Sequence, residues 1–204
     1  MNYIHLIKPM ALLDQLEKGT AEAYILLDTD TYIMPGFLDE VNASLANGIG
    51  MNFFVRKNPY PEFSHSGFFM PDGKFYQYSS TQSLMYNSGV IAIKKTDRKI
   101  IEDTIFLIHK LLGEKLEKFD IEQFALSEAI ILNKNNVIPI YKSIHHYHSR
   151  WKRRYIHWCL SHKNLGEFQN LKIGRPFVKP TKNIVRIFKF ISLLKSSLNR
   201  LRII

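Results

Sequence analysis

The chain has 204 residues, of which 46% are hydrophobic and 23% are charged. This composition is that of a globular protein and excludes a low-complexity chain. The single cysteine, Cys159, excludes an internal disulfide and favours a reducing compartment, so we expect a cytoplasmic protein.

The net charge of +10 is unevenly distributed along the chain. Residues 1–149 contain 14 Lys and Arg against 17 Asp and Glu, whereas residues 150–204 contain 14 against one. The balances of −3 and +13 predict a core region, 1–149, followed by a basic C-terminal region, 150–204. Such a region favours an anionic partner, and its alternative interpretation is a solvated tail.

Hydrophobic periodicity and turn residues divide the core region into alternating helices and strands. In chain order we expect helix 9–19, strand 23–27, helix 37–45, strand 49–55, a long loop 58–83 with a hairpin at 71–73, strand 84–93 interrupted at 87–89, helix 100–116, helix 121–132 and strand 137–140. The alternation predicts an α/β fold, in which the continuous apolar run 23–27 is a strand buried on both faces. Residues 184–204 form a basic amphipathic pattern, suited to an anionic membrane surface or to packing on the core.

The acidic turn Asp28-Thr29-Asp30 follows strand 23–27 directly. Ligands bind at such strand ends in open α/β sheets, and two carboxylates at this spacing can share one hard divalent cation. Mg²⁺ or Mn²⁺ held there would neutralise a diphosphate leaving group. The alternative is that these aspartates only cap a helix or form a turn.

Four segments in one order carry a resemblance to a known family. They are YILLDTDTYIMPG at 24–36, MYNSGVI at 85–91, FDIEQF at 119–124 and IHHYH at 144–148. Together they resemble glycosyltransferases of the GT-A fold, closest to the glycogenin-like and lipopolysaccharide-galactosyltransferase-like type. The resemblance covers about residues 20–150 and implies a Rossmann-like mixed sheet flanked by helices.

The resemblance implies a metal centre and a donor site. Asp28 and Asp30 would bind Mn²⁺ or Mg²⁺, with Asp28 also contacting the nucleotide-sugar. A late histidine would complete the metal shell. His146 is the first candidate and His148 the second. A histidine cluster is otherwise a packed structural feature.

Further residues are candidates for binding the sugar and for catalysis. Asn87, Ser88, Gly89 and Gln123 would contact the sugar, and the alternative for the 87–89 turn is a β-bulge. Two acids, Asp120 and Glu122, would orient the acceptor hydroxyl or remove its proton. Alternatively, they are favourable there only because of the helix dipole.

The sequence departs from the family pattern at its front and near its end. Only 27 residues precede Asp28, whereas a nucleotide-binding half-sheet usually has a full βαβ unit before that point. We therefore expect a partial GT-A fold whose sheet exposes an edge and apolar faces. The terminal phosphate contact of some relatives is matched only weakly, by Lys172 and Arg175.

The sequence thus predicts a metal-dependent glycosyltransferase. It would move a sugar from a nucleotide-diphosphate donor to a glycan or lipid-linked acceptor, in cell-surface polysaccharide or lipooligosaccharide synthesis, with the basic region held peripherally on the inner membrane face. The first alternative is a truncated, inactive remnant. The second is a nucleic-acid-binding protein that uses the basic and aromatic residues 150–155. A metal phosphohydrolase also uses clustered aspartates, but it fits the Asn-Ser-Gly-Val segment less well.

Overall fold

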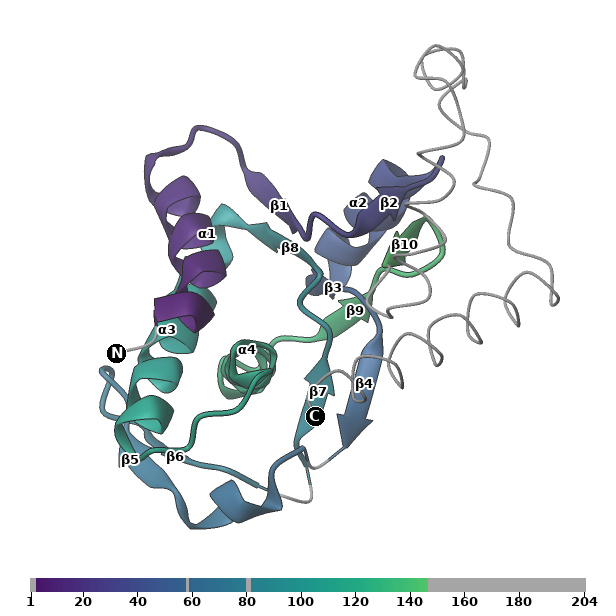
Figure 1. The fold of residues 1–204 in the computed structure, drawn as a ribbon. Coiled ribbons are helices and arrows are strands. Elements are labelled where there is room, and N and C mark those ends of the chain that lie inside the picture. The colour runs from purple at the N-terminus through teal and green to yellow at the C-terminus, as the bar shows by residue number, and fades with distance from the viewer. Residues whose placement is uncertain (1–2, 58, 80–81, 147–204) are drawn as a thin grey trace, which may run out of the picture. The chain divides into compact units, whose positions relative to one another are not determined.

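The computed structural model describes residues 3–57, 59–79 and 82–146 (Figure 1). It has two units: Met1–Asp28 with Leu38–Lys142, and Thr29–Phe37 with Ser143–Ile204. The described residues form α-helices and a mixed sheet, which confirms the α/β class. Five predictions fall outside the described residues: the boundary at 149/150, the nucleic-acid contacts at 150–155, the amphipathic helix 184–204, His148, and the pair Lys172 and Arg175.

The central sheet of the first unit has the strand order β1-β8-β3-β9. Its strands are β1 (Ala23–Leu27), β8 (Val90–Lys94), β3 (Ile49–Met51) and β9 (Val137–Pro139). The first three strands pair antiparallel and β9 pairs parallel to β3. Residues 90–93 of β8 are fully buried, as expected for an apolar strand that packs on both faces.

Strand β1 lies at the edge of this sheet, with β8 as its neighbour. The prediction that residues 23–27 are buried on both faces is wrong: β1 is only half-buried, and the side chain of Ile25 is 37% exposed. The physical reason is the strand's position, because an edge strand lacks a neighbour on one side. Within the described residues the sheet ends at β1, whereas the expectation that its apolar faces are exposed is wrong, because helices pack on both faces.

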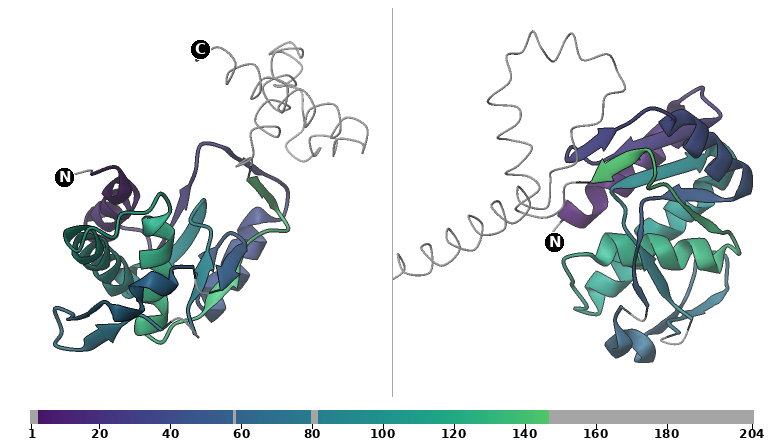
Figure 2. Two further views of the ribbon diagram at one scale, coloured as in Figure 1. Left: turned by 60° about the horizontal axis from the view of Figure 1, so that its bottom comes forward. Right: turned by 90° about the vertical axis from the view of Figure 1, so that its right-hand side faces the viewer.

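Helices cover both faces of the sheet, as both views in Figure 2 show. One side carries α1 (Ile7–Lys18), α3 (Arg98–Gly113) and α4 (Ile121–Leu132), with α3 packed against the other two. Most of the apolar core lies on this side. Helix α2 (Phe37–Asn47) covers the other face, where Ser44 lies close to the backbone of β3.

Helix α4 has the most buried sequence of these helices, and residues 124–130 are buried without interruption. Its Phe124 stacks edge-on against three other aromatic rings, those of Tyr60, Phe63 and Tyr78, with centroid distances of 5.2, 5.4 and 5.3 Å. Such ring contacts add to area burial. They fix the helix, and therefore fix the position of its N-terminal turn, which carries three of the predicted site residues.

Residues 49–86 differ from the prediction in detail. The expected strand 49–55 is two strands, because β4 (Phe54–Lys57) leaves the central sheet and pairs with β7 (Leu84–Tyr86). The expected loop contains a short helix, η2 (Pro61–His65), and a hairpin of β5 (Gly67–Phe69) and β6 (Phe75–Gln77). The predicted turn at residues 71–73 is confirmed, with Gly73 at a φ of +81°. Two further single turns are η1 (Tyr3–Leu6) and η3 (Lys95–Asp97).

The second unit contains one described strand pair. Strand β2 (Thr31–Ile33) pairs antiparallel with β10 (Ile144–His146), and His146 lies opposite Thr31. The backbone N–H of Met34 extends the pairing by donating to the carbonyl of Ser143. Over the described ranges of both units, no helix combines the length and apolar character needed to cross a bilayer.

Gly50 in β3 gives a direct test of the packing of the sheet against α2. A Cβ added there would lie 2.5 Å from Ile140 Cδ1, 2.6 Å from Ser44 Oγ and 2.9 Å from Ala92 Cβ. Because overpacking a closed core is costly, we expect Gly50→Ala to lower the free energy of unfolding by about 1–3 kcal/mol. Urea denaturation measures this. Gly113→Ala is the matched control, since a Cβ there meets no described atom within 4 Å, and equal midpoints for the two variants would refute the packing.

Candidate functional site

The end of β1 and the β7–β8 turn form the base of the candidate site in the first unit. The antiparallel register places Leu27 opposite Val90, so Asp28 emerges beside the 87–89 turn. The backbone N–H of Asp28 donates to the carbonyl of Gly89 at 2.9 Å. Two segments that are about 60 residues apart in the sequence are thereby brought together.

Hydrogen bonds to the first turn of α4 hold the 87–89 turn. The Asn87 side chain donates from Nδ2 to Gln123 Oε1 at 3.0 Å, and the Ser88 backbone N–H donates to the same oxygen at 3.3 Å. The Gly89 N–H donates to Asn87 Oδ1 at 2.9 Å. These four predicted sugar-binding residues therefore lie together, and their mutual hydrogen bonds orient both amide side chains.

Lys8 links the acidic turn to α4. Its ammonium Nζ lies 2.7 Å from Asp28 Oδ1 and 3.6 Å from Glu122 Oε1. The side chains of Lys8, Asp28 and Glu122 are 30%, 23% and 14% exposed, so the charges are partly shielded from water. One cation thus stands between two of the carboxylates that the sequence predicts.

The environment of the Glu122 carboxyl shifts its pKa. Burial raises the pKa of its carboxyl above the ordinary value, and the charge of Asp28 acts in the same direction. Lys8 and a hydrogen bond with Ser88 partly offset this rise in pKa. Because Lys8 Nζ stands 3.6 Å from Oε1, beyond hydrogen-bond reach, we treat that contact as an ion pair. Among the described residues, this buried oxygen has no hydrogen-bond partner.

Asp120 has different neighbours. Its carboxylate accepts hydrogen bonds from the Tyr60 hydroxyl and, at 3.2 Å, from Arg56 Nη2. The Arg56 guanidinium also lies over the Tyr60 ring, 5.1 Å from its centroid. These contacts hold the start of α4 in place. Of the two predicted catalytic acids, only Glu122 shares Lys8 with Asp28.

The predicted metal ligands fall in different units. Asp28 belongs to the first unit, whereas Asp30 and His146 belong to the second. The structure describes the backbone of His146 but not its side chain. Among the side chains it does describe, no group of three or more His, Cys, Asp and Glu could hold a metal ion. The carboxylate donors of Asp28 and Asp30 are nevertheless of the kind that Mn²⁺ and Mg²⁺ prefer, so they fit such an ion chemically.

Sequence reasoning missed Lys8. The residue lies in the otherwise apolar first turn of α1, and a single lysine there looks like any solvent-facing side chain. Only the packing of α1 against α3 and β1 brings it to Asp28. A cation on the helix before an acidic turn is the one weak signal that could have identified it.

Comparison with known proteins finds no matching family model and no matching curated protein. The function is therefore inferred from the geometry and chemistry of the described residues.

Proposed function

We propose that this chain is a GT-A-type glycosyltransferase, which moves a sugar from a nucleotide-diphosphate donor to a hydroxyl group of a glycan or lipid-linked acceptor. One observation carries the proposal. Three segments singled out by the resemblance, at residues 28, 87–89 and 122–123, are joined within the first unit by hydrogen bonds and by the ion pairs of Lys8 with Asp28 and Glu122. A mixed sheet whose edge strand leads into the acidic turn supports the same proposal.

The proposed donor site begins at the acidic turn. In this proposal Asp28, Asp30 and His146 would be the ligands of one Mn²⁺ or Mg²⁺ ion, as the resemblance implies. Such an ion, when bound, supplies positive charge to the diphosphate leaving group. Lys8 neutralises Asp28 in the described structure, and its ammonium can also attract a phosphate oxygen.

The other residues act on the sugar and the acceptor. The amides of Asn87 and Gln123, which are fixed by their mutual hydrogen bond, are suited to orient sugar hydroxyls. Glu122 is suited to take the proton of the acceptor hydroxyl, since a raised pKa makes a carboxylate a stronger base. Asp120 supports this turn through Arg56 and Tyr60. We place the reaction in cell-surface polysaccharide or lipooligosaccharide synthesis at the inner membrane face.

Calorimetric binding of UDP tests the donor site. We expect wild-type protein to bind UDP with Mn²⁺ present and to lose that binding in excess chelator. Asp28→Asn and Asp30→Ala should each weaken binding by about tenfold or more, because each removes a charged oxygen ligand. The matched control is Asp39→Asn, an exposed acid on α2.

Two outcomes of this titration would count against the proposal. Equal affinity in wild type and both variants would remove the assignment of the acidic turn. No UDP binding by wild type under any condition would favour the alternative of an inactive glycosyltransferase remnant.

A further inference from the structure

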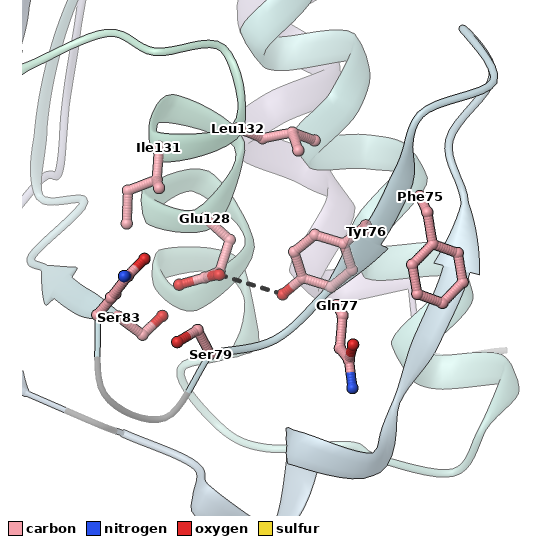
Figure 3. A pocket seen from close by; sticks show the side chains of 9 residues that line it. Phe75, Tyr76, Gln77, Ser79, Ser83, Glu128, Ile131 and Leu132 are labelled. Carbon is pink, nitrogen blue, oxygen red and sulfur yellow. Dashed lines mark hydrogen bonds between the residues drawn. The ribbon is translucent and has the colours of Figure 1, made fainter.

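A polar cavity lies in the first unit, between α4 and the chain segment that continues β6. Its volume is about 150 Å³, enough for several water molecules. Figure 3 shows Glu128 reaching into it from α4, opposite the hydroxyls of Ser79 and Ser83. Among the residues lining it, Glu128 is the single Asp, Glu, Lys, Arg or His.

The carboxyl group of Glu128 is buried and half satisfied. The residue is 6% exposed, and its Oε2 accepts a hydrogen bond from the Tyr76 hydroxyl at 3.2 Å. Its Oε1 has no hydrogen-bond partner within the part of the chain that the structure describes. Burial of an unsatisfied carboxyl oxygen is costly. A fold that keeps a half-satisfied carboxyl group beside a polar cavity suits an occupant that donates a hydrogen bond.

The rest of the lining indicates the chemistry of that occupant. Amides of Gln77 and Gln82 and hydroxyls of Ser79 and Ser83 both donate and accept hydrogen bonds. The ring of Phe75, which is 54% exposed, offers an apolar wall. An anion is disfavoured beside Glu128, and a permanent cation finds neither a second acid nor an aromatic cage.

We propose that this pocket binds a neutral sugar, with one sugar hydroxyl donating to Glu128 Oε1. Neighbouring hydroxyls exchange hydrogen bonds with the serine and glutamine side chains, while an apolar face of the sugar ring lies against Phe75. The pocket is separate from the candidate transfer site. Glu128 follows Glu122 by six residues, which is about 9 Å along the axis of α4 and brings it to a different face of the helix.

This inference does not rest on the proposed function, because it concerns binding and not transfer. Saturation-transfer NMR tests it with the methyl glycosides of glucose, galactose, mannose and N-acetylglucosamine, each at about 10 mM to detect millimolar affinity. We expect saturation transfer to at least one of them. Glu128→Gln should weaken its binding about tenfold, and Glu128→Leu, which removes the acceptor, should abolish it.

Controls separate this pocket from the other site and from misfolding. Thermal unfolding reports whether each variant is folded, and Glu114→Gln, an exposed acid just after α3, should bind as wild type does. Asp28→Asn should also retain the signal, since it alters only the transfer site. The proposal is overturned if no glycoside binds wild type, which would leave a water-filled cavity. It is equally overturned if folded Glu128→Leu binds normally, or if Asp28→Asn alone loses the signal.

Discussion

Glu122→Gln should lower the rate of UDP release from UDP-sugars by about 10²- to 10⁴-fold, the usual contribution of a general base. The measurement is Mn²⁺-dependent release of UDP from UDP-glucose, UDP-galactose or UDP-N-acetylglucosamine, with water as acceptor. The amide keeps the shape of the side chain but cannot accept the proton. The affinity for UDP should change little, because in the proposed mechanism Glu122 acts on the acceptor and not on the diphosphate.

The pH profile distinguishes a base from a structural acid. A base acts in its ionised form, so the wild-type rate should rise with pH through the pKa of Glu122, which burial places above its ordinary value. Because Lys8 lowers that pKa, Lys8→Met should move the rising limb to higher pH. In Glu122→Gln the limb should be absent. Asp120→Asn loosens the contacts with Arg56 and Tyr60. It should lower the rate of UDP release less than Glu122→Gln does and lower the free energy of unfolding more.

A rate for Glu122→Gln within about threefold of wild type would rule out general-base catalysis by this residue. Glu114→Gln, which is exposed and outside both sites, controls for the loss of one negative charge.

The sequence contained enough local signal for most of the elements. The patterns at 121–132 and 23–27 predicted α4 and β1 with their observed bounds. The 87–89 interruption was predicted because turn residues break an apolar run. What the pattern of one strand cannot encode is its neighbours. For that reason β1 was expected to be buried on both faces, although it lies at the sheet edge, and residues 49–55 were expected to form one strand, although they serve two sheets.

The candidate site was predictable only in its parts. Asp28, Asn87 and Gln123 each lie in a recognisable segment, but their hydrogen-bonded proximity depends on the pairing of β1 with β8 and on the packing of α4. Lys8 and Glu128 gave no distinctive signal. Glu128 lies in a stretch of α4 that is apolar apart from Ser127, where a lone acid is expected to face solvent. Its burial is a property of tertiary packing, which a single sequence does not display.

The stability of the protein should fall between about pH 5 and about pH 8, with Glu128 as the principal cause. Burial raises the pKa of Glu128 from 4.5 to about 7, against the opposing effect of the Tyr76 hydrogen bond. Over this interval the folded protein binds more protons than the unfolded chain, so the free energy of unfolding decreases as pH rises. A shift of this size corresponds to about 3 kcal/mol.

Glu128→Gln should remove most of this slope, because the amide has no proton to lose. Urea denaturation at about pH 5, 6, 7 and 8 measures it: the variant and wild type should have similar stability at the lowest pH, and the variant should be more stable by up to about 3 kcal/mol at the highest. In Glu128→Gln the free energy of unfolding should still decrease slightly as pH rises, since burial also raises the pKa of Glu122. The hydroxyl of Tyr78, whose pKa is raised to about 12, does not titrate in this range. If the free energy of unfolding had the same pH dependence in wild type and Glu128→Gln, the pKa of Glu128 would be the same in the folded and the unfolded chain. In that case a buried, half-satisfied Glu128 would no longer support ligand binding in the pocket either.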